Sequence, residues 1–374
     1  MSEGEALINF GTRRRAAAKL GLRMWTAFSN YLRHFASKSP RGWHPLLAVY
    51  YLTYACEFRC PYCSDGSGTP YHALRSPVLR GDNLDRLLLR LRRVCDHLVI
   101  TGGEPSRHPD FGEFLRLLPR HRFDGVVLTT IGHDLAPFLD DIAQSIRYLV
   151  FSLDTMDPAK ADAWLGRGAG CHAQILATIE AARRHPRRRF EILISSVATP
   201  DNLPDLRDVF RYAAERGFRH AVCPVLRGVA PDPALAGDPR YRALFDFLIE
   251  QKRRGFPVNG SLAYLRAMRD LRKFRCRPST TLAVSPVGDV FYPCLEIGKV
   301  AGNLLEECNL HKLRAEGMRR HGAEPVCGNQ CHSACALAFS LILDKPWTMV
   351  SEVALMAKTW WRRRLAGRPA LPPA

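Results

Sequence analysis

The sequence has few lysines and lacks any long apolar run. Nine of its 54 basic residues are lysines and 45 are arginines, against 36 acidic residues, which leaves a formal net charge of +18. This positive field favours an anionic partner such as phospholipid, a phosphorylated substrate, nucleic acid or an acidic protein. The longest apolar stretch, Ala334–Leu343, is far shorter than the ~18 residues that span a bilayer. We therefore expect no transmembrane helix.

Features of a secreted protein are also missing. The first residues, MSEGEALINFGTRRRAAAKLG, lack the continuous apolar segment and the small-residue cleavage motif of a secretory signal. The 12 cysteines are therefore not expected to form a secreted disulfide framework. No internal repeat and no low-complexity linker is visible. We expect a cytoplasmic protein in a reducing environment, with cysteines available for metal.

Short β runs alternate with amphipathic helical patterns from residue 46 onward. The β runs are expected at 46–53, 97–100, 125–130, 148–154, 190–197 and 220–225. The helical patterns between them centre on 84–94, 111–118, 135–146, 172–184 and 203–216. This alternation predicts an α/β fold, a partial (β/α)6 TIM-like barrel, with a doubly wound sheet as the alternative. Polar motifs directly after the β runs favour the barrel, where chemistry gathers at the carboxyl ends of strands.

Composition divides the chain into four parts. We expect a basic amphipathic helical segment at 1–45, the barrel at 46–255 and a small cysteine-rich extension at 256–340, where proline and glycine interrupt regular structure. Residues 341–374 form the fourth part, an amphipathic helix rich in tryptophan and arginine. The predicted fold is therefore a barrel with a small extension and amphipathic terminal helices.

Three cysteines are closely spaced in the segment Cys56-Glu-Phe-Arg-Cys60-Pro-Tyr-Cys63. Three thiolates can bind three irons of a cubane and leave the fourth iron open for a substrate or cofactor. Zinc sites usually pair one C-x2-C with a second pair nearby, and no second pair follows here. The spacing, with Tyr62 before the last cysteine, resembles the signature of the radical S-adenosylmethionine (SAM) superfamily.

That resemblance implies a [4Fe–4S] cluster at Cys56, Cys60 and Cys63, and a reductant such as flavodoxin or ferredoxin. SAM would bind the open iron and be cleaved reductively to a 5′-deoxyadenosyl radical, which abstracts hydrogen from a substrate. The segment Thr101-Gly-Gly-Glu-Pro105 resembles the family's GGEP motif, which holds the SAM amino group. Across residues 46–230, the resemblance implies these SAM-binding residues: Tyr62, Gly102, Gly103, Glu104, Pro105, Ser152, Asp154 and Asn202.

A second group of cysteines follows the barrel. Its last three members occur in Cys327-Gly-Asn-Gln-Cys331-His-Ser-Ala-Cys335. The pattern resembles the twitch and SPASM extensions of radical SAM enzymes, which implies an auxiliary Fe–S cluster and favours oxidation, cross-linking or carbon-skeleton modification. A zinc site stays the alternative, because four thiolates suit zinc equally well. The predicted ligands are Cys276, Cys294, Cys331 and Cys335, with Cys327 as the alternate ligand and Cys308 as a further candidate.

Cys223 ends the sixth β run and is the candidate catalytic residue. Barrel geometry can aim its thiol into the active site, where it would donate hydrogen to a substrate radical. The alternative is a small apolar residue of the core.

Both ends of the chain predict amphipathic helices. Basic side chains share one sector of the N-terminal helix, and a C-terminal apolar stripe precedes Arg362-Arg-Arg364. Tryptophan beside arginine suits the inner face of an anionic cytoplasmic membrane; packing on the barrel is the alternative. The stripe is formed by Val350, Val353, Ala354, Ala357, Trp360 and Trp361.

These features support a radical SAM enzyme that acts on a membrane-associated lipid or isoprenoid-like substrate. A maturase of ribosomally made peptides or a small-metabolite dehydrogenase is the alternative. A non-catalytic Fe–S electron carrier would need neither the Gly102–Pro105 motif nor an open iron. Nucleic acid is not expected as a partner, because no RNA-binding module is visible.

Overall fold

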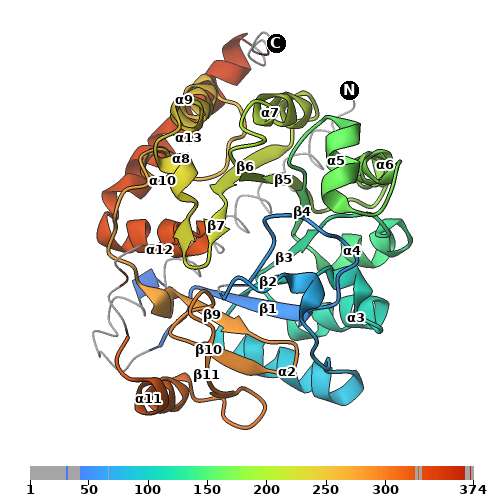
Figure 1. Cartoon of the computed structure of the whole chain (residues 1–374), viewed down its shortest axis with the longest axis vertical. Coiled ribbons are helices and arrows are strands. Elements are labelled where there is room, and N and C mark those ends of the chain that lie inside the picture. Colours follow the sequence, from blue (N-terminus) through green and yellow to red (C-terminus); the bar gives the residue numbers. More distant parts are fainter. Residues whose placement is uncertain are drawn as a thin grey trace, which may run out of the picture.

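The computed structural model describes residues 31–32, 43–65, 67–324, 327, 331–366 and 371 (Figure 1). The predicted N-terminal helix lies almost entirely outside these residues. The side chains of Trp360 and of residues 362–364 also lie outside the description.

A single large sheet organises the described part of the chain. Its nine strands follow the order β11-β10-β9-β1-β2-β3-β4-β5-β6. The strands β1 to β6 run parallel, each bonded to the next, which confirms the predicted α/β partial barrel. They span Leu47–Thr53, His97–Gly102, Gly125–Thr130, Tyr148–Ser152, Glu191–Ala198 and Arg219–Pro224.

Amphipathic helices connect the parallel strands. Helix α7 is typical, because Leu206, Val209 and Phe210 recur at helical spacing and are buried. Hydrophobic periodicity did not predict helix α5. Its start is marked by a local signal instead, because Asp157 accepts hydrogen bonds from two backbone N–H groups and Pro158 occupies the first turn. The connecting helices are α2 (Gly81–Val94), α3 (Phe111–His121), α4 (Leu139–Ser145), α5 (Pro158–Leu165), α6 (Cys171–Arg184) and α7 (Leu206–Glu215).

The cysteine-rich extension continues the barrel sheet. Strand β9 (Thr281–Val284) pairs parallel with β1, from Leu47 opposite Thr281 to Tyr50 opposite Val284. Strands β10 (Asp289–Tyr292) and β11 (Lys299–Asn303) follow in antiparallel order. A turn at Gly288 joins β9 to β10 with a positive φ of 94°, a conformation that glycine adopts readily. Strand β9, followed by β10 and β11, therefore occupies the edge of β1 opposite β2.

Further short strands and helices follow β6. Figure 1 shows α12 and α13 on the same side of the molecule as α9 and α10. Among the described residues, no helix is long and apolar enough to cross a membrane. These elements are β7 (Leu226–Arg227), β8 (Ala230–Pro231), α8 (Pro233–Ala236), α9 (Pro239–Arg254), α10 (Leu262–Arg269), α11 (Leu310–His321), α12 (Ala334–Asp344) and α13 (Trp347–Ala366).

Helix α13 turns a polar side chain toward the protein and its apolar side chains away from it. Glu352 pairs with Lys252 of α9 at 2.5 Å and accepts a bond from the backbone N–H of Leu262. On the other face, Trp347 and Val350 are 64% and 71% exposed. This is the reverse of an ordinary surface helix, whose apolar stripe faces the core.

Candidate active site

A cavity of about 250 Å³ opens at the carboxyl ends of the parallel strands. Strands β1 to β5 each end in side chains that line it, as expected for a barrel site. The first cysteine group covers the cavity from the loop after β1. Its lining includes Tyr51, Cys56, Cys60, Tyr62, Cys63, Tyr71, Thr101, Gly102, Gly103, Glu104, Thr130, Ser152, Asp154 and Ser195.

Two glycines bind the second strand tightly to the cysteine loop. A Cβ on Gly102 would lie 2.1 Å from the carbonyl oxygen of Thr53, and one on Gly103 would lie 2.5 Å from that of Ala55. The backbone N–H groups of Gly103 and Glu104 donate to these same carbonyls at 2.8 and 2.9 Å. The glycines therefore allow backbone to approach backbone, which fixes the segment that leads into Cys56.

Glu104 is buried and held entirely by protein donors. Its Oε1 accepts bonds from the Ser106 N–H, the Ser106 hydroxyl and, at 2.7 Å, the Thr130 hydroxyl. Its Oε2 accepts a single bond, from the Ile131 N–H at 2.8 Å. Burial raises the pKa of this carboxyl, and the hydrogen bonds oppose the rise. Because a carboxylate oxygen has more than one lone pair, Oε2 can still accept a bond from a ligand.

Asp154 occupies the opposite wall of the cavity. It accepts bonds from the Tyr62 hydroxyl and, at 2.7 Å, from the Val197 N–H. Burial raises the pKa of Asp154 to about 6, despite these bonds. Behind it, the Asn202 amide donates to the carbonyl oxygens of Asp154 and Val197 at 3.0 and 2.9 Å. Asn202 therefore orients the loop that carries Asp154.

Most of the predicted SAM-binding residues meet in this cavity. Two do not line it, because Pro105 is buried in the turn after Glu104 and Asn202 is fully buried behind Asp154. The residues that do line it are Tyr62, Gly102, Gly103, Glu104, Ser152 and Asp154.

The three thiols of the first group influence one another. Burial raises the pKa of Cys56 to about 11 and that of Cys63 to about 12, with the charge of Cys56 adding to the effect on Cys63. The pKa of Cys60 is raised by burial and then by the charge of Cys63. Three neighbouring thiols that retain protons fit a site where metal binding releases them.

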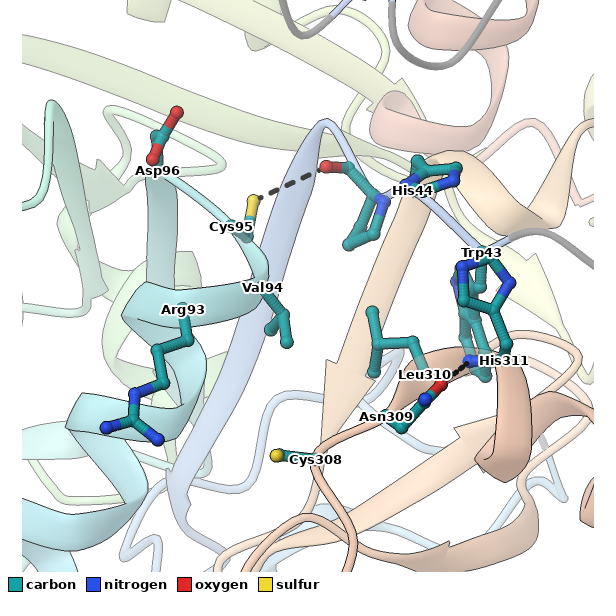
Figure 2. A pocket seen from close by; sticks show the side chains of 11 residues that line it. Trp43, His44, Arg93, Val94, Cys95, Asp96, Cys308, Asn309, Leu310 and His311 are labelled. Atoms are coloured by element: carbon teal, nitrogen blue, oxygen red, sulfur yellow. Dashed lines mark hydrogen bonds between the residues drawn. The ribbon is translucent and has the colours of Figure 1, made fainter. Parts of the chain in front are cut away.

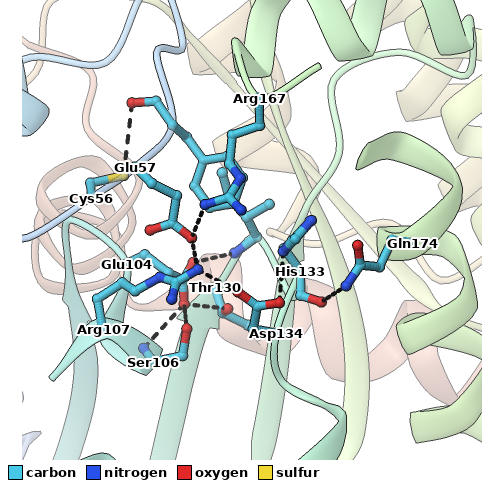
Figure 3. A network of polar contacts seen from close by, with 12 residues as sticks. Cys56, Glu57, Glu104, Ser106, Arg107, Thr130, His133, Asp134, Arg167 and Gln174 are labelled. Atoms are coloured by element: carbon cyan, nitrogen blue, oxygen red, sulfur yellow. Dashed lines mark hydrogen bonds and ion pairs between the residues drawn. The ribbon is translucent and has the colours of Figure 1, made fainter. Parts of the chain in front are cut away.

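An ion-pair network braces the cysteine loop from outside the cavity (Figure 3). Arg107 contacts both Glu57 and Asp134, and Arg167 lies 3.2 Å from Glu57. Within the described part of the chain, one group of three metal-type side chains has ligand atoms that all lie within 4.8 Å of one another. It consists of Glu57, His133 and Asp134. Because guanidinium groups already bind both carboxylates, the network serves to anchor Glu57, beside Cys56.

A second cavity, of about 270 Å³, lies inside the barrel. Alternate side chains of β1, β2 and β9 line it, as the two-residue period of a strand requires. Tyr51 and Thr101 line both cavities, so the two share a wall. Five of the six candidate cysteines of the second group also line it: Cys276, Cys294, Cys327, Cys331 and Cys335.

Four of these five thiols interact electrostatically as one group. Burial raises the pKa of Cys276 to about 12, with contributions from Cys331, Cys294 and Cys327. The pKa of Cys335 rises to about 11 through burial and the charge of Glu296, without a contribution from another cysteine. The charges of Cys294, Cys327 and Cys331 therefore act on Cys276, and that of Glu296 acts on Cys335. All five thiols line the same cavity.

Cys223 lies between the two sites without lining either cavity. Burial raises its pKa to about 12, and the charges of Asp154, Cys335 and Glu296 add to the rise. Its sulfur atom lies 3.8 Å from the carbonyl oxygen of Ser196. The half-buried thiol thus lies near groups of both sites.

A third cavity, of about 360 Å³, lies at the opposite end of the barrel (Figure 2). It is lined by residues that precede β1 and β2, including Cys95, and by Cys308 before α11. The Cys95 thiol donates to the Pro45 carbonyl oxygen at 3.6 Å. Cys308 therefore lies outside the second cysteine group.

Sequence reasoning missed several residues of the two cavities. Thr130 ends a predicted strand, so the rule that selected Ser152 could also have selected it. Tyr51 and Glu296 had no comparable signal, because only tertiary structure places them between cysteine groups. Tyr71 stacks on Tyr51 with ring centroids 6.0 Å apart.

The fold and the site define a class of protein. A partial parallel barrel presents three cysteines and a buried glutamate around one cofactor-sized cavity at the carboxyl ends of its strands. Residues 50–213 match the model of the radical SAM superfamily, so this part of the chain is similar to that superfamily.

Curated relatives support the assignment. The GTP 3′,8-cyclases of Brucella abortus and Brucella canis are 31% identical over 185 residues, which is 46% of this chain and 51% of theirs. The chain therefore spans about half the length of these relatives.

Solved structures share the fold over a longer stretch. Streptococcus suis SuiB bound to S-adenosylmethionine has a TM-score of 0.59 at 18% identity, covering 75% of this chain and 68% of SuiB. SuiB bound to its precursor peptide SuiA has a TM-score of 0.61 at 16% identity, covering 82% and 74%. AnSMEcpe with bound AdoMet has a TM-score of 0.55 at 15% identity, covering 84% and 99%.

Proposed function

We propose that the chain cleaves SAM reductively and abstracts hydrogen from a substrate C–H bond. The observation that carries the proposal is that Cys56, Cys60, Cys63, Glu104 and Asp154 line one cavity. When bound, a [4Fe–4S] cluster at the three thiolates supplies the electron, and SAM supplies the 5′-deoxyadenosyl radical. A flavodoxin or ferredoxin would reduce the site.

Different residues would bind different parts of SAM. Glu104 offers its less occupied oxygen to the SAM amino group, a charge-assisted bond in a buried place. Asp154 and Ser152 face the polar part of the nucleoside. The two glycines and the Glu57 network keep the cysteine loop fixed against the barrel.

Anaerobic reconstitution with SAM and dithionite tests this proposal. We expect 5′-deoxyadenosine from the wild-type chain and none from the Cys56→Ala/Cys60→Ala/Cys63→Ala variant. Absence of the product from iron-loaded wild type, or its persistence in the variant, would refute the proposal. A non-catalytic electron carrier would take up iron and electrons without forming the product.

We further propose an auxiliary Fe–S cluster in the second cavity, ligated by Cys276, Cys294, Cys327 and Cys331. Among the described residues, neither cysteine group has three sulfur atoms all within 4.8 Å of one another. Four sulfur atoms bound to one zinc ion at about 2.3 Å lie closer to one another than that. A cubane binds each thiolate through a separate iron, so its sulfur ligands need not lie so close together. Mössbauer spectra and metal content separate the two: zinc at this site in anaerobically purified protein would contradict the cluster.

We propose a membrane-associated, lipid or isoprenoid-like substrate as the first candidate. Its support is the outward apolar face of α13, which suits insertion at a bilayer interface next to a positively charged protein. Flotation with anionic vesicles tests it, and the Trp347→Ser/Val350→Ser/Val353→Ser variant should lose binding. Wild-type protein that stays unbound at low salt would rule out this substrate class.

A peptide substrate is the second candidate. Its support is the shared fold with SuiB, which was solved with a precursor peptide. Because the curated relatives are named GTP 3′,8-cyclases, GTP is a necessary comparison substrate. Coupled 5′-deoxyadenosine formation, measured separately with vesicles, peptide and GTP, chooses among them.

A further inference from the structure

A fourth cavity, of about 280 Å³, lies between the cysteine loop after β1 and the hairpin formed by β7 and β8. Arg59 lines it from the cysteine loop and Arg227 lines it from the hairpin. The fourth cavity adjoins the first, because the two share these lining residues: Cys60, Tyr62, Cys63 and His72. A molecule in the fourth cavity would therefore lie next to the first cysteine group.

The hairpin is attached firmly to the barrel. The backbone N–H of Val225 donates to the carbonyl oxygen of Ala198 at the end of β5, at 2.9 Å, and the N–H of Asp232 donates to the carbonyl oxygen of Val225 at 2.9 Å. Within the hairpin, Arg227 pairs with Ala230. Arg227 therefore extends toward the fourth cavity from an anchored strand.

The guanidinium group of Arg227 is oriented by Asp232. Its Nε donates to one carboxylate oxygen of Asp232 at 2.9 Å, and the other oxygen accepts a bond from the N–H of Ala234 at 2.9 Å, which fixes the carboxylate at the start of α8. Among the described residues, the two terminal nitrogens of Arg227 have no acceptor. They are the pair of donors that binds an oxyanion in a bidentate manner.

Arg59 supplies a second guanidinium group without a carboxylate partner. Its backbone N–H donates to the carbonyl oxygen of Leu165 at 2.9 Å, and its exposed side chain has no ion pair within the described part of the chain. The nearby Arg107 and Arg167, by contrast, both bind carboxylates. No aspartate or glutamate is among the described residues that line the fourth cavity, so the cavity carries an uncompensated positive charge.

The amount of positive charge selects a phosphate group over a carboxylate. A single carboxylate would neutralise only one of the two guanidinium groups. A phosphate monoester carries a charge of about −1.5 to −2 at pH 7 and offers three acceptor oxygens, so it can bind both. Because Arg59 and Arg227 are both exposed, the cavity is open to solvent and a charged group can enter it.

We propose that the fourth cavity binds a phosphate group of the substrate, with Arg227 as a specificity residue and Arg59 as its partner. The inference rests on the proposed function, which makes the bound molecule the substrate of the adjoining first cavity. The shared chemistry, a phosphate ester, is found in phospholipids, isoprenoid phosphates and nucleotides. An unmodified peptide lacks it.

Calorimetric titration of the iron-loaded protein with n-hexyl phosphate, n-hexanoate and n-hexanol tests the proposal. These probes share a chain and differ in the polar group. We expect hexyl phosphate to bind about tenfold more tightly than hexanoate, as additional charge-assisted hydrogen bonds allow, and hexanol to bind most weakly. Arg227→Gln should weaken hexyl phosphate binding about tenfold, and Arg59→Gln/Arg227→Gln should abolish the preference. Iron content is measured for every variant, because Arg59 is next to Cys60.

Arg240→Gln is the matched control. Arg240 and Arg227 are exposed to a similar extent, 57% and 65%, and each pairs with an aspartate at the start of a helix. Arg240 lines none of the four cavities, so this variant should bind hexyl phosphate as the wild type does. Equal weakening in Arg227→Gln and Arg240→Gln would show that net charge attracts the probe, and would overturn the inference. Equal affinity of the wild type for hexyl phosphate and hexanoate would also overturn it.

Competition against bound hexyl phosphate identifies the source of the phosphate group. The competitors are vesicles that contain phosphatidate, GTP and inorganic phosphate. Displacement by the vesicles or by GTP supports the inference and names the source, whereas displacement by inorganic phosphate alone, or by none of the three, overturns the assignment to a substrate.

SAM cleavage by the wild type is measured on the same preparation. Intact cleavage without a preference for phosphate defeats this inference and leaves the proposed function standing. A preference for phosphate without cleavage supports the binding site and counts against the proposed function.

Discussion

At the scale of single residues, Glu104 shows how strand ends prepare a cofactor site. The carboxylate is buried, so free in an apolar pocket it would favour the protonated form. Donors from Ser106, Thr130 and Ile131 surround it instead. The protein thereby keeps a hydrogen-bond acceptor fixed and facing the cavity before any ligand arrives.

Glu104→Gln should weaken SAM binding by at least about tenfold, because the amide loses the charge that attracts an ammonium group. It should also lower the free energy of unfolding by about 1–3 kcal/mol, since a buried donor loses its acceptor. Calorimetric titration with SAM and urea unfolding measure the two effects. Glu113→Gln, at an exposed position of α3, is the control, and unchanged SAM affinity in Glu104→Gln would contradict the assignment.

His220 gives a second residue-scale prediction, and it belongs to neither cysteine group. It is 1% exposed, its Nε2 lies 2.9 Å from the Ser196 hydroxyl, and its Nδ1 has no partner among the described residues. Burial lowers its pKa from 6.5 to about 3. The unfolded chain therefore binds more protons than the folded chain below pH 6.5, and acid favours unfolding.

We expect this histidine to cost the protein about 2 kcal/mol of unfolding free energy between pH 7.5 and pH 5.0. His220→Leu should remove that part of the pH dependence. Ser196→Ala should retain it, because burial rather than the hydroxyl depresses the pKa. Urea unfolding at both pH values is the measurement, and identical pH slopes for wild type and His220→Leu would disprove the assignment.

At the scale of elements, β1, the cysteine loop and the end of β2 act as one unit. The loop is bonded to β2 through Thr53 and Ala55, and Gly102 and Gly103 leave no room for a side chain there. The resemblance of the motif implied residues that hold the SAM amino group. It did not predict that the glycines face the cysteine loop, because that contact joins segments far apart in the chain.

Gly103→Ala should therefore lower iron binding by the first cysteine group. Its Cβ would lie 2.5 Å from a backbone oxygen that cannot move without shifting the loop. Gly237→Ala is the control, because its Cβ meets nothing within 4 Å. Iron content after reconstitution, in a background without the second-group cysteines, is the measurement. Equal iron content in both variants would show that the loop adapts.

Local patterns predicted the elements of the barrel well for a physical reason. Alternating apolar side chains in strands and apolar faces in helices are recognisable within about ten residues. Their periodicity therefore predicted the bounds of β1 to β6 to within one or two residues. The pairing of β9 with β1 depends on segments that are more distant in sequence. The same is true of the wall that Tyr51 forms between the two cavities. A single sequence carries no local trace of such contacts, which is why the position of Glu296 beside the second cysteine group emerged only from the structure.

At the scale of the whole molecule, the sheet joins both cysteine groups in one folding unit. Strand β1 bonds to β2 on one side and to β9 on the other. Without residues after 255, β1 would be an exposed edge strand with unpaired backbone groups, which promotes aggregation.

A chain that ends at Gly255 should therefore be insoluble, or should lack cooperative unfolding. A chain that ends at Lys345 should stay folded, because the one described helix that it loses is α13, which joins the rest of the protein through Glu352. Solubility and circular dichroism during heating compare the two. A soluble, cooperatively folded chain ending at Gly255 would show that the barrel needs no β9.

The pairing of β1 with β9 has a further consequence for synthesis of the protein. On the ribosome, Cys56, Cys60 and Cys63 emerge long before Thr281–Val284, which supplies the second neighbour of β1. Contacts this distant in sequence form late. The nascent chain therefore carries these three cysteines beside an unpaired edge of β1 until Thr281–Val284 has been translated, and their loop reaches its final surroundings only after that.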